Sequence, residues 1–322
     1  MIEISPLDLR GTSEEGRMGD MLKKNNAIKK TILMGILSIL TFLVLSDEAR
    51  AGERTPLLKR VSFRLSGGYS YMSLGDLNTY VSSWNYYYEK YAVSRGGSVP
   101  EKYEYLHDGY NLEGEILINL SSRWAASFSL GHIDMENNTT LIYRAAANDE
   151  TKHFLTHVVK VTPLTVGVYY SFPLLRKIKF FLHTGVGYYF AKLSQDYDFQ
   201  RFDDYWAKWQ KDMSSSDFGF QGGIGFEWDI KKYLSLVLGV YGQHAKIKPF
   251  EGTRKYENSL GYQSEQEGVF YCWEEYDPEV GISSLLILPE KPEPAWNIKD
   301  IREFILDLKG ISLRLGIKIK LF

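Results

Sequence analysis

The sequence lacks an apolar run long enough to cross a membrane as a helix. Its longest run, from Thr31 to Leu45, falls short of the about 20 residues that a spanning helix needs, which disfavours an N-terminal membrane anchor. Four lysines between Lys23 and Lys30 precede the run, and a small-residue segment ending at Ala51 follows it. This is the layout of a cleaved secretion signal. We therefore expect residues 1–51 to be an N-terminal extension and signal peptide, and residues 52–322 to be one mature domain.

Disulfides and a surplus of basic charge are also missing. Cys272 is the one cysteine, so no disulfide forms within the chain, although export would permit one. A closed, hydrogen-bonded sheet is a way to stabilise an exported fold without such cross-links. The chain has 38 Lys and Arg against 40 Asp and Glu, a formal charge of -2. This balance gives no indication of a nucleic-acid partner.

The mature sequence consists largely of runs that alternate apolar and polar residues. Its mean hydropathy of -0.26 resembles that of a soluble protein, but alternating strands cancel in such an average. Runs of about ten residues with period two have the length and pattern of transmembrane strands. We predict eight strands, at 61–71, 110–120, 124–131, 164–172, 178–190, 218–229, 234–243 and 311–322.

Short and long connections alternate strictly between these strands. Short turns are expected at Leu120–Trp124, Pro173–Lys177 and Asp229–Tyr233, whereas long connections fall at about 73–109, 133–157, 192–216 and 246–309. Outer-membrane barrels have this asymmetry, with short periplasmic turns and long extracellular loops. The rhythm of eight runs disfavours a soluble sandwich or a lipocalin-like barrel.

Aromatic residues mark both ends of the apolar faces, where ring systems prefer the membrane–water boundary. The predicted outer ends carry Tyr69, Tyr71, Tyr110, Tyr188, Phe190 and Phe218. The predicted inner ends carry Trp124, Tyr170, Phe172, Phe180, Phe226 and Trp228. The sequence therefore predicts two aromatic girdles.

The opposite faces carry charges of both signs. Once such a sheet closes, the last, first and second strands become neighbours, and a barrel of eight strands is just wide enough for side chains to fill it. Charges kept from water are tolerated when they are paired. We therefore predict an ion-pair network that fills the interior, in preference to a path for protons or solutes, formed by Arg64, Glu113, Glu115, Glu227, Arg314 and Lys318.

The first long connection contains an aromatic helix. Asp76 is placed as its N-cap, and the residues from Leu77 to Tyr91 have apolar side chains at three-to-four spacing. Such a helix caps the barrel or lies on lipid headgroups, in preference to gating a ligand or binding a partner. In the last connection, the apolar run Ile282–Leu288 is expected to extend the barrel.

Residues typical of enzymes show no catalytic arrangement. The six histidines are scattered, and His153 and His157 have a spacing that suits a metal on a helix, whereas their segment is expected to be extended. The glycines form no nucleotide-binding fingerprint. We expect no catalytic residue, no metal site and no cofactor.

The segment from Arg64 to Tyr71, leading through Gly75–Asn78 into the aromatic helix, resembles the opening of small bacterial outer-membrane β-barrel domains, a group that includes proteins similar to outer membrane proteins A, W and X. The resemblance implies a terminal assembly signal at Phe322, although Lys318 and Lys320 stand where that signal is usually hydrophobic. Members of the group are variously adhesins, structural anchors and conduits for small hydrophobic molecules.

These observations predict an all-β fold: an eight-stranded antiparallel up-and-down transmembrane β-barrel with long extracellular loops, one carrying a short helix. The expected role is structural, surface-interacting or narrow transport in the outer membrane after export. Expected partners are outer-membrane lipid, the barrel assembly machinery, and a small hydrophobic ligand or surface partner at the loops. Alternatives are a soluble periplasmic or secreted ligand-binding barrel and an outer-membrane enzyme acting on lipid or peptide.

Overall fold

A computed structural model describes residues 60–145, 150–201, 204–278 and 280–321. The expected signal peptide and the expected assembly signal at Phe322 lie outside these described residues.

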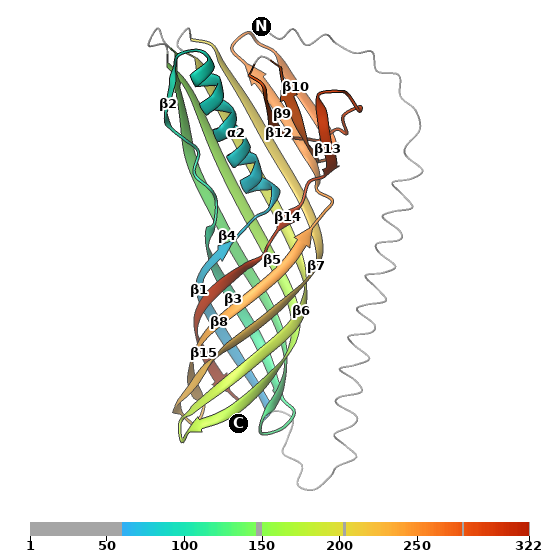
Figure 1. The fold of residues 1–322 in the computed structure, drawn as a ribbon. Coiled ribbons are helices and arrows are strands. Elements are labelled where there is room, and N and C mark those ends of the chain that lie inside the picture. Colours follow the sequence, from blue (N-terminus) through green and yellow to red (C-terminus); the bar gives the residue numbers. More distant parts are fainter. Residues whose placement is uncertain (1–59, 146–149, 202–203, 279, 322) are drawn as a thin grey trace, which may run out of the picture. The chain divides into compact units, whose positions relative to one another are not determined.

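Eight antiparallel strands close into a ring (Figure 1). Neighbours pair in the order β1-β3-β4-β5-β6-β7-β8-β15, and β15 pairs with β1 to complete the circle. Each expected strand overlaps one member of this ring, so the all-β class and the eight-strand antiparallel arrangement are confirmed. The strands are β1 Val61–Met72, β3 Asp108–Asn119, β4 Trp124–Arg144, β5 Glu150–Leu175, β6 Ile178–Arg201, β7 Trp206–Lys231, β8 Leu234–Ile247 and β15 Gly310–Lys320.

Two of the long connections are not loops. Strands β4 to β7 contain 21, 26, 24 and 26 residues. Within 133–157 and 192–216, β4 therefore stays paired with β5 as far as Arg144 and Glu150, and β6 with β7 as far as Gln200 and Trp206. The pairing is unbroken at positions such as Asn137 opposite His157. The prediction of loops was therefore wrong in these two segments. Apolar and polar residues continue to alternate there, but the apolar residues lie on the opposite face from the one they occupy in the ring.

The remaining strands lie beyond the ring. β2 (Ser98–Glu101) pairs with β4, β9 (Glu251–Asn258) pairs with β7 and β10 (Gln263–Val269), and β14 (Leu306–Asp307) pairs with β8. A separate three-stranded sheet contains β11 (Tyr271–Asp277), β12 (Ile282–Leu288) and β13 (Ile298–Glu303). The expectation that Ile282–Leu288 extends the barrel was wrong, because its pairing partner is β11.

The described residues contain one α-helix, α2 (Asp76–Ser94), in the predicted connection. No helix among the described residues is both long enough and apolar enough to cross a membrane. Gly75, with φ 54°, is the N-cap, so the prediction of Asp76 was wrong. The Asp76 carboxylate instead accepts hydrogen bonds from Arg302 (2.5 Å) and from the backbone N–H of Ile305 (2.9 Å).

We call the described residues within 73–107, 132–162, 191–216 and 244–308 the head. Figure 1 shows α2 alongside the extended strands in this part. Side chains of α2 contact the inward face of those strands, as in the packing of Tyr80 near His157 and of Tyr88 against His153. The head core is apolar, with buried side chains from the helix, the extended strands and the second sheet, including Leu77, Val81, Leu141, Leu155, Val159, Leu193, Phe250, Phe270, Leu285 and Phe304.

The chemistry of the two faces inverts between ring and head without a change of register. In the ring, inward residues such as Ser127 and Ser129 are buried and polar, whereas Phe128 and Leu130 on the outside are exposed. Farther along the same strand, Ile133 points inward and is 1% exposed. The outward positions of the head become polar: His132, Glu136, Lys160, Lys192, Asp196, Lys208 and Asp212.

Candidate functional site

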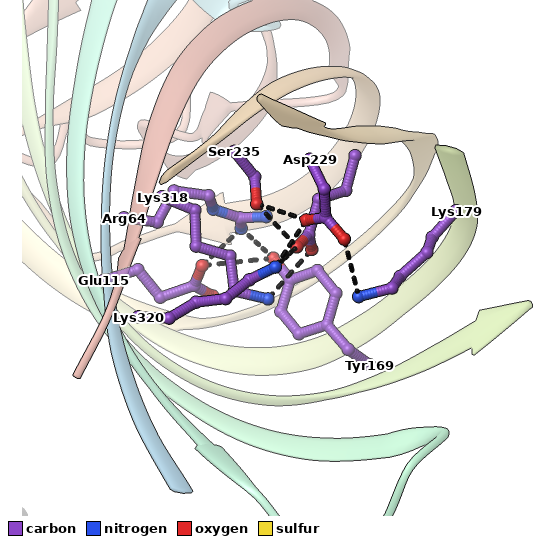
Figure 2. A network of polar contacts seen from close by, with 9 residues as sticks. Arg64, Glu115, Tyr169, Lys179, Asp229, Ser235, Lys318 and Lys320 are labelled. Atoms are coloured by element: carbon purple, nitrogen blue, oxygen red, sulfur yellow. Dashed lines mark hydrogen bonds and ion pairs between the residues drawn. The ribbon is translucent and has the colours of Figure 1, made fainter. Parts of the chain in front are cut away.

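The first candidate site is the interior of the ring, where cations and carboxylates meet (Figure 2). Arg64 on β1 lies directly opposite Glu115 on β3, and the two side chains form an ion pair while 3% and 2% exposed. Alternation explains the placement, because every second residue of both strands points inward. Glu115 also accepts a hydrogen bond from the Tyr169 hydroxyl at 3.4 Å.

A second pair joins Arg314 and Glu113, whose charged atoms are 2.7 Å apart and whose side chains are each 4% exposed. Aromatic rings pack against both arginines: the guanidinium carbon of Arg64 is 4.7 Å from the centroid of Tyr169, and that of Arg314 is 4.6 Å from the centroid of Tyr241. Cation–π contacts of this kind gain strength away from water. Neither tyrosine was singled out in the sequence, because nothing local indicates this stacking.

The third group lies nearer the short turns. Glu227 pairs with Lys318 at 2.9 Å and with Lys320 at 3.2 Å. Asp229 pairs with Lys320 and, at 3.4 Å, with Lys179, and Ser235 donates hydrogen bonds to both carboxylates. Figure 2 shows Lys179, Asp229, Ser235, Lys318 and Lys320 of this group converging from different strands. The six charges singled out in the sequence thus lie in three groups. The third group also contains Lys179, Asp229 and Lys320, which were not singled out.

Side chains occupy the cross-section of the ring. His183 stacks on Tyr169 with centroids 4.3 Å apart, and Ser129 and Thr165 hydroxyls are 2.5 Å apart. A cavity of about 50 Å³ at the turn end is bounded by residues that include Arg64, Glu227 and Lys318. At the other end the apolar head core begins with Met72. Side chains therefore fill the interior of the ring between these two ends.

The aromatic residues singled out in the sequence lie on the outside of the ring at its two ends. The end nearest the head carries exposed Tyr69, Tyr71 and Tyr110, with Tyr188 half-buried; the turn end carries exposed Trp124, Phe172, Phe226 and Trp228, with Tyr170 half-buried. Neighbouring rings touch within each set. Tyr69 and Tyr110 have centroids 6.3 Å apart, and those of Trp124 and Tyr170 are 4.6 Å apart.

The second candidate site is a polar cluster inside the head. His153 and His157 are inward residues of β5, so an extended strand rather than a helix presents them. Nδ1 of His153 lies 2.6 Å from the Tyr197 hydroxyl, and Nε2 of His157 lies 2.9 Å from Nε2 of Gln195. Burial lowers the pKa of each histidine to about 3, and the charge of Lys211 contributes at His157.

Neither metal binding nor thiol chemistry is indicated in the described segments. No group of three His, Cys, Asp or Glu side chains there is placed to hold a metal ion. Cys272 is buried beside Asp76 and Arg302, and burial, reinforced by the Asp76 charge, raises the pKa of its thiol to about 12. A thiol that stays protonated is a poor nucleophile.

Comparison with known proteins gives structural matches alone. No family model and no curated protein sequence matches the chain. Similar solved structures are OprG from Pseudomonas aeruginosa (10% identity, TM-score 0.35, 81% of this chain and 96% of that one), a major outer membrane protein from Thermus thermophilus (12%, 0.33, 80% and 98%) and the outer membrane protease OmpT from Escherichia coli (7%, 0.26, 83% and 98%). All three are outer membrane proteins. At these identities and TM-scores the matches carry no inference about this chain's activity.

The Arg64–Glu115 pair gives a first prediction. Replacing Glu115→Gln leaves a buried guanidinium without its directly opposite carboxylate, which we expect to lower the free energy of unfolding by about 3–5 kcal/mol. Arg64→Met should act similarly, and the double variant should lose less than the sum, because no buried charge is stranded. Urea titration of the folded protein in vesicles measures all three. Glu136→Gln, an exposed position of β4, serves as control, and strictly additive losses would refute the coupling.

The head histidines give a second prediction. Since the folded pKa of His157 is about 3 and its ordinary value is about 6.5, the unfolded head binds more protons between these values. Stability is therefore present above about pH 6.5 and is lost as the pH falls toward about 3. Hydrogen exchange of α2 amides, corrected for intrinsic rates, should show this loss. His157→Leu should make this loss of stability with falling pH shallower, whereas His132→Leu, at an exposed outward position, should not. Equal slopes of stability against pH in the two variants would contradict the prediction.

Proposed function

We propose that the protein is an integral outer-membrane β-barrel whose ring spans the bilayer and whose head presents a surface outside the cell. The supporting observation is the inversion of the two faces. The ring buries charged and hydroxyl side chains and exposes an apolar band, whereas the head does the reverse. The band includes Phe63, Leu65, Leu112, Ile116, Phe128, Leu130, Leu182, Val186, Phe220, Ile224, Leu238, Val240, Leu313, Leu315 and Ile317, each at least 40% exposed.

Water is a poor solvent for such a band. Contiguous apolar surface of this extent is unfavourable in water and favourable in lipid. A closed ring also leaves no unpaired strand edge, which hydrocarbon requires of any extended segment that crosses it. The two aromatic sets then lie where headgroups meet the acyl chains. Outer-membrane lipid is the partner that this surface fits.

The soluble ligand-binding alternative requires the opposite arrangement. A ligand barrel in water would place its apolar residues inward around the ligand, but the interior here holds Arg64, Arg314 and their carboxylates. The ring interior therefore favours the membrane assignment.

An enzymatic role finds little support among the described residues. His132 approaches Asp134 at 3.9 Å and His244 approaches Asp307 at 3.8 Å, both beyond hydrogen-bond distance, and both histidines are exposed. We propose a non-enzymatic role as a structural anchor and surface-interaction protein, because the filled interior disfavours passage of solutes and the head carries varied polar side chains outward.

The membrane assignment predicts a difference between two identical substitutions. Leu315→Lys places an ammonium in the middle of the apolar band, and we expect it to lower the free energy of unfolding in lipid vesicles by about 2–4 kcal/mol. Leu260→Lys makes the same change at an exposed residue of the head and should be nearly neutral. Urea titration in vesicles measures both. Equal effects, or release of the wild-type protein from membranes by carbonate, would overturn the assignment.

Because its interior is filled, the ring is expected not to conduct ions. Reconstituted in a planar bilayer, the wild-type protein should show no stable large conductance, since aromatic rings and ion pairs occupy the cross-section. Truncating the two stacking rings together, Tyr169→Ala with Tyr241→Ala, should raise the conductance above the wild-type level. A large stable wild-type pore would contradict the filled interior.

A further inference from the structure

The head contains two neighbouring cations without a carboxylate. Lys211 on β7 lies directly opposite Arg254 on β9, and both are on the inward face. Lys211 is 7% exposed, and Arg254 is half-buried. Neither forms an ion pair in the portion of the chain that the structure describes. Like charges directly opposite each other on adjacent strands repel, and burial increases the cost.

The groups around Lys211 are neutral. Its ammonium donates to the Gln195 Oε1 at 3.0 Å and lies 5.4 Å from the centroid of the Tyr80 ring. The side-chain amide nitrogen of Gln195 donates a hydrogen bond to Nε2 of His157 at 2.9 Å. The neutral imidazole therefore carries its proton on Nδ1. That Nδ1 is buried and has no hydrogen-bond partner. The ammonium, which has three donors, is left with donors in excess of acceptors.

Arg254 shows the same excess. Its Nη1 donates to the Gln266 Oε1 at 3.2 Å, while its Nε is buried without a partner. The strands and helix around the two cations therefore contribute an amide from β6, an imidazole from β5, a phenol from α2 and an amide from β10. The buried carboxylate of the head, Asp76, is engaged by Arg302 instead.

Loss of a proton by the lysine would relieve half of this imbalance. Burial, together with the charge of Arg254, lowers the pKa of Lys211 to about 7. A guanidinium, however, cannot be deprotonated in a protein, so the charge of Arg254 persists and its buried Nε still lacks an acceptor. An anion between the two side chains satisfies both cations and accepts the unused hydrogen bonds.

We propose that the head binds one oxyanion group, a phosphate or a carboxylate, between Lys211 and Arg254. The site is formed by the cross-strand pairing of β7 with β9 and does not depend on where the ring resides. Bound there, the anion joins the β9–β10 hairpin to the wall of extended strands through charge-assisted hydrogen bonds.

Calorimetric titration of the full-length protein in detergent tests the site. Inorganic phosphate, sulfate and acetate are each titrated at constant ionic strength set with chloride, at about pH 6, where Lys211 is protonated. We expect saturable binding to one site, weakened by roughly tenfold or more in Lys211→Met and in Arg254→Met. Preference for phosphate and sulfate assigns a tetrahedral group, and preference for acetate assigns a carboxylate.

Matched variants separate the site from general charge effects. Lys208→Met and Lys255→Met remove cations from the exposed outward faces of the same two strands and should leave binding unchanged. Gln195→Glu places a carboxylate beside the ammonium as an internal counter-ion, so it should abolish anion binding while the head stays folded. Absence of saturable binding for all three anions, or unchanged affinity in both Lys211→Met and Arg254→Met, would overturn the proposal.

Discussion

The pairing of β15 with β1 is the interaction on which the rest of the structure depends. Without it the first and last strands would be edges with unpaired backbone groups, which are costly in hydrocarbon and invite association in water. Closure with eight strands also fixes the width of the interior at what side chains can fill. Because both strands alternate strictly, closure brings Arg64 opposite Glu115 on one side and Lys318 on the other. The two like charges are tolerated because each has its own carboxylate, Glu115 and Glu227.

The head inherits its geometry from the ring. Half of the wall, β4 to β7, continues beyond the aromatic residues, whereas β1, β3, β8 and β15 end near them. An open half-wall would expose the inward face of the long strands, so the residues of that face become apolar and α2 with the second sheet covers them. This division explains why one continuous strand has a polar inward face at Ser129 and an apolar one at Ile133.

The sequence predicted the ring well because two local signals agree there. Period-two alternation identifies each strand and its outward face, and aromatic ends identify its limits. The six interior charges followed from parity alone. The structure of the head was harder to predict from the sequence. Apolar residues such as Leu155 point inward there, whereas those of the ring point outward, and alternation alone does not indicate which face is inside. The role of Asp76 was missed for another reason: its partner Arg302 is 226 residues away, and capping rules use local sequence.

Buried cations are paired with carboxylates in the ring interior but not at one position of the head interior. In the ring, the inward cations Arg64, Arg314, Lys318 and Lys320 each have a carboxylate partner. In the head, the exposed Arg302 pairs with Asp76. Lys211 and Arg254 depart from that pattern at a single cross-strand position, although outward neighbours such as Lys255 do pair with acids. A chain that matches its other inward cations so consistently leaves this position electrostatically incomplete, and an anion from solution is the group that completes it.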